Sequence, residues 1–463
     1  MVDIPDDLRR RLETYGQEHV LAGWESLAEE TRKQLLGQLE ALDLELLRQL
    51  FHQGAKPYQL PPHDKIKPVP VARLAGSRET RHAGEEALRR GQVAVLVVAG
   101  GQGSRLGFDQ PKGMYPIGPV SNKSLFQIHA EKVLALRRRH KQTIPFLVMT
   151  SDATHAETEK FFEDNKSFGL PPGEVAFFRQ GTMPALDCVT GKLLLEAPGR
   201  LFTSPNGHGG TLTALADSGL LDHLRGRGIK QIFYFQVDNP LVKIADDAFL
   251  GHHISRNAEV STKVVPKLGP LDKLGNLVSV DGRCTIIEYS DLPRWLAEQT
   301  DKSGNLKISA GNTAIHAFSV DFLDRVTTGQ GRIPFHVARK KVPCIDAEGQ
   351  LIQPEKENAF KFEMFIFDSL PMADRWTVAE TTRPEEFEPL KNATGPDSPE
   401  TVKQALGNLA ADWLGKAGVR VPRTAEGHAA VPLEVSPLFA LDAEELARKV
   451  DKGLKIEGPT YLQ

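Results

Sequence analysis

Leucine recurs every three or four positions near the start of the chain, and mostly polar residues fill the positions between. The series is Leu35, Leu39, Leu42, Leu46 and Leu50. Because an α-helix turns once in about 3.6 residues, this spacing places the leucines on one helical face. The pattern predicts an amphipathic helix with a packing role and no chemistry of its own.

A proline-rich segment, PYQLPPHDKIKPVP at 57–70, follows this helical region. Proline removes a backbone donor and breaks helices, so the segment predicts an extended connection. The polar stretch 78–92 then predicts one more helix, which leads into the first strand. We therefore expect a domain boundary near residue 90.

From there, short apolar runs alternate with polar, helix-like sequence. The runs are Val93–Val98, Pro145–Ser151 and Ile232–Asp238. A continuous apolar run is typical of a strand buried on both faces, and this alternation predicts a three-layer α/β fold with a mainly parallel sheet. After about residue 392 the sequence changes to short helical pieces and a proline-interrupted tail. We expect a mostly helical N-terminal segment (1–90), an α/β domain (91–385) and a small C-terminal domain (386–463).

Composition limits the range of partners. The chain has 463 residues, of which 40% are hydrophobic and 25% charged, with a formal net charge of −3. No basic block with interleaved aromatic residues argues for nucleic acid, so we expect anionic ligands to be met by local lysines and arginines. Nothing in the sequence indicates an obligate protein partner.

Cysteine use and hydropathy indicate the compartment. The three cysteines, Cys188, Cys284 and Cys344, stand singly, without the spacing of a zinc site or of a disulfide framework. The N-terminal sequence is charged, and no stretch approaches the roughly 20 apolar residues of a membrane span. We expect a soluble, cytoplasmic protein with no membrane partner.

The first apolar run breaks into a glycine-rich turn, VLVVAGGQGSRLGFDQPKG at 95–113. Gly100, Gly101 and Gly103 let the backbone turn tightly and bring its amides close to an anion. Arg105 and Lys112 add positive charge beside the turn. The pattern predicts a nucleotide-phosphate site, against the alternative that these glycines form only a turn.

The spacing differs from that of two well-known phosphate loops. A P-loop requires GxxxxGK[ST], whereas Gly113 follows Lys112, so no hydroxyl is in place for a metal. The dinucleotide fingerprint GxGxxG also fails, because Leu106 stands where the third glycine belongs. Neither a P-loop ATPase nor a dehydrogenase is indicated.

Asp238 is the strongest acidic candidate. It ends the apolar run IFYFQVD and is followed by Asn239 and Pro240. Ligands of parallel sheets bind beyond the carboxyl ends of the strands, where Asp238 and the glycine turn both fall. Magnesium binds through one or two carboxylates together with phosphate oxygens and water. The alternative is an aspartate that only forms the turn before Asn-Pro.

Ordered motifs extend over most of the chain. They are AGGQGSRLG (99–107), QPKGMYPIG (110–118), KSLFQIHAEKV (123–133), VDNPLV (237–242), EYSDL (288–292), AGNTAIHAF (310–318), KKVP (340–343), KFEMFIFD (361–368) and EEFEPLKNA (385–393). Together they resemble the eukaryotic-type UDP-N-acetylglucosamine pyrophosphorylases of the UDP-sugar pyrophosphorylase superfamily. The resemblance implies a Rossmann-like nucleotidyltransferase fold, Mg²⁺ as cofactor, and UTP and a hexose 1-phosphate as substrates.

The resemblance also implies roles around the phosphates. Asp238 is matched to the magnesium ligand at the nucleotide α-phosphate. Arg105 and Lys112 are matched to the residues that hold the triphosphate and balance the leaving group, and Lys391 is matched to a lysine at the phosphates of the product. Taken without the match, Arg105 and Lys391 are ordinary surface cations.

Uridine recognition is implied for two glycine-rich segments and one amide. The residues are the backbone groups of Leu96, Ala99, Gly100 and Gly101, the side chain of Gln180, and Gly207 and His208 of the loop TSPNGHGG (203–210), while Asn239 is expected to bind substrate. Gln180 also ends the strand-like run VAFFRQ and needs no ligand there. His208 stands where these enzymes are expected to have asparagine, and Gly-His-Gly resembles UDP-glucose and broad-specificity UDP-sugar pyrophosphorylases.

The resemblance implies sugar recognition by Gly275, Glu288 and Asn312, matched through LGNLVSVDG, EYSD and AGN. A carboxylate and an amide suit this role, because together they accept from and donate to sugar hydroxyls. Phe365 and Phe367 alternate, so we expect them on one face of a strand, where they resemble the aromatic wall beside an N-acetyl group. The alternative is two core phenylalanines. The aromatics favour acetylglucosamine and His208 favours glucose.

The leading hypothesis is therefore a uridylyltransferase that forms UDP-N-acetylhexosamine and pyrophosphate by in-line attack of the sugar phosphate on the UTP α-phosphorus. The alternative in the same class is a UTP–glucose-1-phosphate uridylyltransferase or a broad-specificity UDP-sugar pyrophosphorylase. A regulatory protein that binds nucleotide sugars without catalysis is disfavoured because the acid and the cations are all present.

Overall fold

The computed structural model describes residues 2–55, 59–74, 78–328, 333–346 and 348–463. The chain forms two compact units, each assembled from separate stretches of sequence. Unit 1 comprises Met1–Gln59, Gly181–Thr211 and Ile333–Ile366, and unit 2 comprises Leu60–Gln180, Leu212–Arg332 and Phe367–Gln463. The domain boundaries expected from sequence, near residues 90 and 385, stay a prediction.

The leucine repeat of unit 1 forms two helices rather than one. Besides α1 (Asp6–Thr14), the unit contains α2 (Glu29–Glu40) and α3 (Leu44–Gln53). Leu42 lies between α2 and α3, and the Asp43 carboxylate accepts a hydrogen bond from the Leu46 backbone N–H at 2.9 Å, which caps α3. Leu35, Leu39 and Leu50 are buried in one apolar cluster, so the expected packing role is confirmed.

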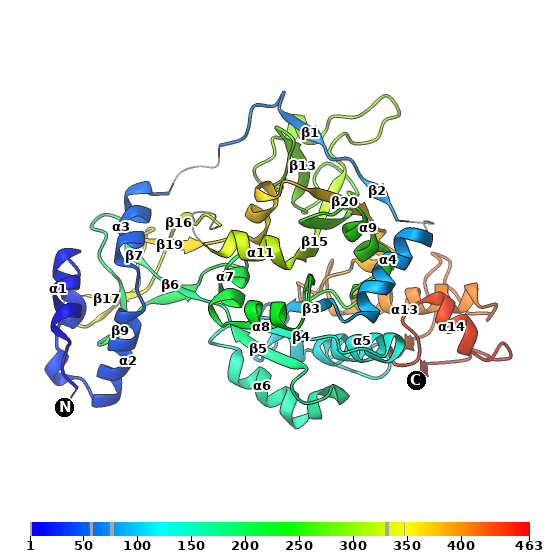
Figure 1. Cartoon of the computed structure of the whole chain (residues 1–463), viewed down its shortest axis with the longest axis horizontal. Coiled ribbons are helices and arrows are strands. Elements are labelled where there is room, and N and C mark those ends of the chain that lie inside the picture. The colour runs from blue at the N-terminus through cyan, green and yellow to red at the C-terminus, as the bar shows by residue number, and fades with distance from the viewer. Residues whose placement is uncertain (1, 56–58, 75–77, 329–332, 347) are drawn as a thin grey trace. The chain divides into compact units, whose positions relative to one another are not determined.

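Short antiparallel strands complete unit 1 and pack against these helices (Figure 1). A three-stranded sheet has the order β16-β19-β7, and β10 pairs with β6. The strands are β6 (Thr182–Pro184), β7 (Leu186–Asp187), β8 (Leu195–Ala197), β9 (Arg200–Leu201), β10 (Thr203–Pro205), β16 (His336–Lys340), β17 (Cys344–Ile345), β18 (Leu351–Ile352) and β19 (Ala359–Glu363). Phe360 and Phe362 of β19 lie in the same cluster as the leucines.

Unit 2 is built on a large, mostly parallel sheet with the strand order β2-β20-β12-β15-β11-β3-β4-β5. Along this order neighbours are parallel, except that β15 is antiparallel to both β12 and β11. Outside this order, β13 pairs antiparallel with β1, β14 and β15. The strands are β1 (Ile66–Pro68), β2 (Ala72–Arg73), β3 (Val93–Val98), β4 (Phe146–Thr150), β5 (Val175–Arg179), β11 (Gln231–Gln236), β12 (Val260–Pro266), β13 (Asn276–Val280), β14 (Arg283–Ile287), β15 (Ala310–Ser319) and β20 (Trp376–Glu380). The predicted α/β fold with a mainly parallel sheet is confirmed.

The helices in chain order after α3 are α4 (Arg78–Arg89), α5 (Leu125–His140), α6 (His155–Asp164), α7 (Gly210–Asp217), α8 (Leu220–Gly226), α9 (Asp247–Ser255), α10 (Arg294–Ala297), α11 (Val320–Thr327), α12 (Arg383–Glu386), α13 (Pro399–Lys416) and α14 (Ala443–Lys449). Successive residues of β11 show the three layers. Phe233 meets Phe249 of α9 on one face, whereas Tyr234 on the other meets Phe318, which stacks on Phe322 of α11.

The C-terminal residues of unit 2 have an apolar cluster of their own, formed by α13, α14 and the parallel pair β21 (Leu433–Val435) and β22 (Thr460–Leu462). Ser398 and Thr401 form a capping box at the start of α13. In the predicted extended connection, β1 pairs with β13, while residues 57 and 58 lie outside the described residues.

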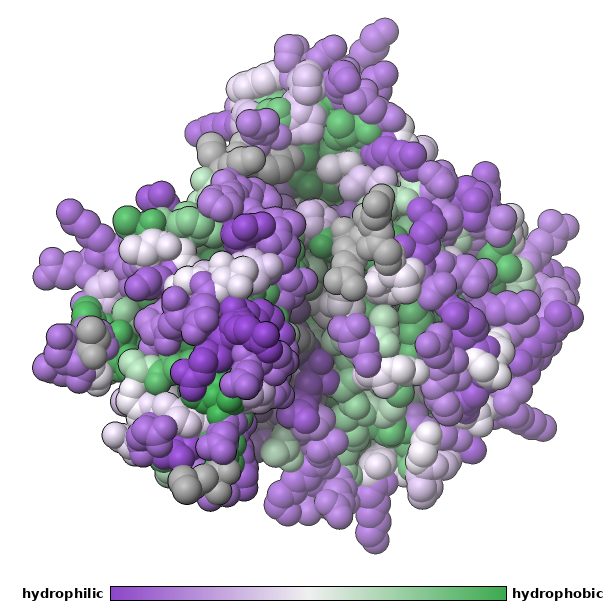
Figure 2. Space-filling view, turned by 60° about the vertical axis from the view of Figure 1, so that its left-hand side comes forward, coloured by the Kyte–Doolittle hydropathy of each residue, from purple (hydrophilic) through white to green (hydrophobic). Residues whose placement is uncertain are grey.

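Hydrophilic residues predominate on the face of the molecule drawn in Figure 2, and hydrophobic residues show there in small groups. No helix in the described part of the chain has the length and apolar character needed to cross a membrane.

Glycine lets α4 and α9 pack with their backbones in direct contact. A Cβ on Gly251 would stand 1.6 Å from the Thr80 carbonyl oxygen, and a Cβ on Gly84 would stand 2.0 Å from that of Asp247. A methyl group at either position has no space, because the obstacle is backbone.

We therefore predict that Gly251→Ala lowers the free energy of unfolding by about 1–3 kcal/mol, the usual cost of overpacking. Urea unfolding followed by circular dichroism measures the effect. The matched control is Gly415→Ala in α13, where no atom lies within 4 Å of the added Cβ, and which should gain up to about 1 kcal/mol from helix propensity. Equal effects of the two changes would contradict the close contact of the helices.

Candidate functional site

The glycine-rich segment after β3 folds back on itself. The Gly103 N–H donates to the Gln110 carbonyl at 2.9 Å, and the Lys112 N–H donates to the Gly101 carbonyl at 3.0 Å. Two 3₁₀ turns follow, at Ser104–Leu106 and Lys112–Met114. A Cβ on Gly103 would come within 2.7 Å of Phe108, so this position of the turn requires glycine.

Gln180, which follows β5, lies against this turn. A Cβ on Gly100 would stand 3.2 Å from Gln180 Oε1, and the Ser151 hydroxyl donates to the Gly100 carbonyl at 2.8 Å. Leu96 and Ala99 are buried in and just after β3. The ends of β3, β4 and β5 meet because the strands are parallel and adjacent, and this brings the predicted uridine residues of unit 2 together.

Asp238 comes two residues after β11, the other neighbour of β3. Its Oδ2 lies 3.8 Å from Lys112 Nζ, and its backbone carbonyl accepts the Leu390 N–H at 2.8 Å. Lys112 Nζ also donates to the Leu390 carbonyl at 3.5 Å. Three segments distant in sequence therefore converge on one carboxylate and one ammonium group.

The two remaining predicted cations lie on these same segments. Arg105 is exposed in the first 3₁₀ turn, and its side chain contacts no carboxylate among the described residues. Lys391 is half-buried next to Leu390, and its backbone N–H donates to the Asp397 carbonyl at 2.8 Å. The positive charge at the site thus comes from the glycine turn and from the start of the C-terminal region.

Asn239 joins the turn after β11 to the segment that carries Lys391. Its Nδ2 donates to the Glu386 carbonyl at 2.8 Å, and its Oδ1 accepts the Glu388 N–H at 3.2 Å. The side chain is buried. These bonds are structural, and substrate binding by Asn239 stays a prediction.

A buried ion cluster lies behind this junction, and sequence reasoning missed it. Lys263 Nζ lies 2.6 Å from Glu386 Oε1 and 2.7 Å from Asp246 Oδ2, and the side chains of Lys263 and Glu386 are each 1% exposed. Glu386 also accepts the Lys243 backbone N–H at 3.1 Å and the Thr381 hydroxyl at 3.0 Å. The signal in the sequence was a single lysine inside the otherwise uncharged strand VSTKVVP.

Electrostatics keep this cluster ionised. Burial alone favours neutral lysine, but the carboxylates of Asp246 and Glu386 hold the pKa of Lys263 above its ordinary value. The pKa of Asp246 is correspondingly lowered by Lys263 against the effect of burial. Because removing one member leaves a buried charge without its partner, the cluster holds the 386–391 segment against the turn after β11.

The three predicted sugar residues also come together: Gly275 just before β13, Glu288 just after β14 and Asn312 in β15. A Cβ on Gly275 would stand 3.5 Å from Glu288 Oε1 and 3.8 Å from Asn312 Cβ. The Asn312 N–H donates to the Gly275 carbonyl at 2.9 Å. The Ile286 Cγ2 methyl group would stand 2.8 Å from a Cβ on Gly275, so Gly275 allows Ile286 to pack closely beside these residues.

Glu288 lies within the field of the phosphate-site residues. Burial raises its pKa above the ordinary value, the carboxylates of Asp291 and Asp368 raise it further, and Lys391 opposes them. Lys391 is thus close enough to act on Glu288 as well as adjoining the junction at Asp238. Lys391 therefore links the predicted phosphate residues and the predicted sugar residues of unit 2 electrostatically.

The remaining predicted residues of the second glycine loop lie in unit 1. His208 Nδ1 accepts the Ile366 N–H at 3.2 Å, and the His208 and Phe365 rings lie 5.5 Å apart. Gly207 has a φ of +82°, and a Cβ there would stand 2.3 Å from the Met364 carbonyl oxygen. The loop therefore packs on residues 364–366.

The expectation that Phe365 and Phe367 share one face of a strand is wrong. Strand β19 ends at Glu363, and Ile366–Met372 form a 3₁₀ helix. The Met364 N–H donates to the Asn206 carbonyl, and the Met364 carbonyl accepts the Gly209 N–H, so the backbone leaves the ladder to bind the glycine loop. The alternation rule applies only while a strand continues.

The donor set suits a metal ion that arrives with phosphate. No group of three or more histidine, cysteine, aspartate or glutamate side chains in the described ranges could hold a metal ion by itself. Asp238 offers one carboxylate, which is enough for magnesium whose other ligands are phosphate oxygens and water. The residues present therefore fit Mg²⁺ bound together with a nucleotide.

Comparison with known proteins identifies the family of the chain. The family model described as UTP–glucose-1-phosphate uridylyltransferase matches residues 45–395. The UDP-N-acetylhexosamine pyrophosphorylase-like protein 1 of Xenopus tropicalis is 37% identical, over 95% of this chain and 92% of that protein. The UDP-N-acetylglucosamine diphosphorylase 2 of Arabidopsis thaliana is 38% identical, over 95% of this chain and 90% of that protein.

Among solved structures, the uridine diphosphate N-acetylglucosamine pyrophosphorylase of Trypanosoma brucei, in complex with an inhibitor, superimposes with a TM-score of 0.79 at 28% identity, covering 97% of this chain and 95% of that one. The resemblance recognised in the motifs is thereby confirmed. The chain belongs to the UTP–glucose-1-phosphate uridylyltransferase family, the nucleotidyltransferases known as UDP-sugar pyrophosphorylases, and its relatives include UDP-N-acetylglucosamine pyrophosphorylases.

Proposed function

We propose that this protein transfers the uridylyl group of UTP to N-acetylglucosamine 1-phosphate and releases pyrophosphate. The observation that carries the proposal is the junction at Asp238, where Lys112 of the glycine turn and the segment before Lys391 meet one strand-end carboxylate. Nucleotidyl transfer needs groups placed around an in-line displacement more than it needs covalent help from the protein.

In this reaction an oxygen of the sugar phosphate attacks the UTP α-phosphorus, and the bond to the β-phosphate oxygen breaks. Lys112 and Arg105 neutralise the triphosphate and the departing pyrophosphate, and Lys391 binds the phosphates of the product. Asp238 holds Mg²⁺, which supplies positive charge at the α-phosphate when the nucleotide is bound.

The base and the sugar bind on either side of this centre. The backbone of the glycine turn and the Gln180 amide take the uracil edge, since Gln180 lies against Gly100. Glu288 and Asn312 hold the sugar hydroxyls beside Gly275. Gly207 and His208 contact base and ribose, and Phe365 and Phe367 flank the N-acetyl group.

Glucose 1-phosphate or a broader range of sugar 1-phosphates is the second candidate, and His208 favours it. Gly-His-Gly resembles the UDP-glucose and broad-specificity enzymes, and Nδ1 of His208 accepts the Ile366 N–H, which fixes the ring beside Phe365.

The deciding experiment measures pyrophosphate release from UTP and Mg²⁺ with the 1-phosphates of N-acetylglucosamine, N-acetylgalactosamine, glucose and galactose. We expect the acetylated sugars to be preferred, by about 10- to 200-fold if the pocket discriminates through one group. Preference for glucose would establish the second candidate. Absence of release with all four sugars would refute the uridylyltransferase proposal.

Removing one charged group at a time tests the proposed roles of Asp238 and Lys112. We predict that Asp238→Asn and Lys112→Ala each lower kcat by about 100- to 1,000-fold, as is usual when one preorganised charge is lost at a reacting centre. The exposed Lys452→Ala should leave kcat unchanged. Full turnover by both variants at saturating Mg²⁺ would refute the assigned roles.

The buried ion cluster should affect turnover because it holds the segment that carries Lys391 in position. We predict that Glu386→Gln lowers kcat by about 10- to 100-fold, because a misplacement of about 1 Å is that costly, with little change in the KM for UTP. Turnover is measured per folded molecule, after the folded fraction has been determined by circular dichroism.

The matched control for Glu386→Gln is Glu174→Gln. Glu174 is a mostly buried carboxylate, paired with Arg137 at 3.0 Å, that precedes β5 at the opposite end of the sheet from the glycine turn. It should lose stability and keep kcat. If both variants keep the wild-type kcat, Glu386 serves stability alone.

A further inference from the structure

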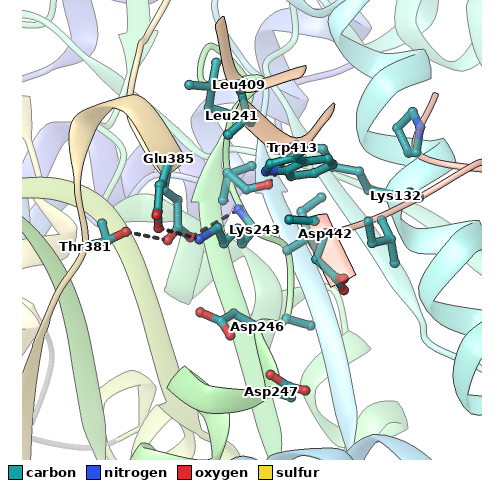
Figure 3. A pocket seen from close by; sticks show the side chains of 18 of the residues that line it. Lys132, Leu241, Lys243, Asp246, Asp247, Thr381, Glu385, Leu409, Trp413 and Asp442 are labelled. Atoms are coloured by element: carbon teal, nitrogen blue, oxygen red, sulfur yellow. Dashed lines mark hydrogen bonds and ion pairs between the residues drawn. The ribbon is translucent and has the colours of Figure 1, made fainter. Parts of the chain in front are cut away.

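A cavity of about 830 Å³ lies in unit 2, lined in part by the segment that follows Asp238 (Figure 3). Its walls come from α5, from the segment that follows Asp238, and from the C-terminal helices α13 and α14. The volume lies within the range of about 300–1,000 Å³ that is usual for small-molecule sites. Leu241, Leu409 and Trp413 supply apolar surface, and Lys132 and Lys243 supply polar surface.

Two lysines on the wall lie outside its ion pairs. Every carboxylate there has a partner within the protein, and most of the cations are paired with one. The pairs are Lys263 with Asp246 and Glu386, Lys243 with Glu385, Arg73 with Glu380, Arg81 with Asp247 and Glu444, and Arg139 with Asp442, while Glu434 accepts from Ser121. Lys132 and Lys416 contact no carboxylate in the part of the chain that the structure describes.

Lys132 is the more informative of the two. Its Nζ donates to the carbonyls of Pro240 at 2.5 Å and Val242 at 2.8 Å, which uses two of its three N–H groups. Burial lowers the pKa of Lys132 to about 7, Glu386 opposes that shift, and Lys243 adds to it. A negative charge beside this ammonium group would favour its charged form.

We propose that this cavity binds a small organic anion, whose acid group pairs with Lys132 and whose apolar or aromatic body packs on Trp413 and Leu409. The bound anion acts on the reaction through the backbone that Lys132 holds. Pro240 and Val242 follow Asp238 and Asn239 directly, and Glu386 and Lys263 on the same wall hold the segment before Lys391. Binding rests on the cavity alone, whereas the effect on turnover also rests on the proposed function.

The binding test is a fluorescence titration of the full-length protein with anilinonaphthalene sulfonate, an aromatic anion. Phenylnaphthylamine, which has the same rings without the sulfonate, is the matched probe. Lys132→Met should weaken the binding of the sulfonate by about tenfold, the equivalent of about 1.4 kcal/mol, and leave the binding of phenylnaphthylamine unchanged. Trp413→Leu should weaken the binding of both probes. Lys452 is exposed, and Lys452→Met should weaken the binding of neither.

Equal affinity of the wild type and Lys132→Met for the sulfonate would overturn the site, as would the absence of binding. If Lys132→Met does not fold, Lys416→Met replaces it, because Lys416 is exposed and its loss leaves the core intact. A weakening of about threefold is then expected, and no weakening would overturn the role of the unpaired lysines.

The effect on turnover is measured as pyrophosphate release with and without saturating sulfonate. It should change in the wild type and in Lys452→Met, and UTP with Mg²⁺ should shift the affinity for the sulfonate reciprocally. Unchanged turnover in a wild type that binds the probe would overturn the coupling. A wild type that is inactive with all four sugars would refute the proposed function, while the titration would still decide the site.

Discussion

The buried ammonium group of Lys263 is the constraint on which the candidate site depends. A lysine inside a central strand is tolerated only when carboxylates neutralise it, and here Asp246 and Glu386 do so at 2.7 and 2.6 Å. Asp246 follows the turn that carries Asp238, and Glu386 precedes the segment that carries Lys391. One buried charge therefore ties together the two segments that deliver the acid and a cation.

The parallel sheet brings together the site residues that follow its strands. Since β11, β3, β4 and β5 are adjacent and run in one direction, Asp238, the glycine turn and Gln180 all emerge at the same edge. The order and direction of the strands are enough to bring these three features close together. Hydrogen bonds such as that from Ser151 to Gly100 then set the detailed geometry.

The site and the cavity differ in how their charges are satisfied. At Asp238 the cation of its ion pair, Lys112 Nζ, is 3.8 Å away, and the Asp238 side chain is 12% exposed. On the cavity wall, carboxylates and cations pair closely, and only Lys132 and Lys416 there lack an acidic partner among the described residues. Asp238 and Lys112 are therefore suited to the phosphate chemistry. The cavity is suited to a ligand whose binding shifts the residues around Asp238.

The sequence by itself determined the strand runs, the glycine turn and the acid after β11, because local composition and spacing specify them. It also carried the family motifs that the comparisons bear out. Only the tertiary structure decided that Gly275, Glu288 and Asn312 meet, that Phe365 and Phe367 do not share a strand, and that Lys263 joins Asp246 to Glu386. Contacts between residues far apart in the sequence depend on strand order and backbone path, which a local pattern does not contain.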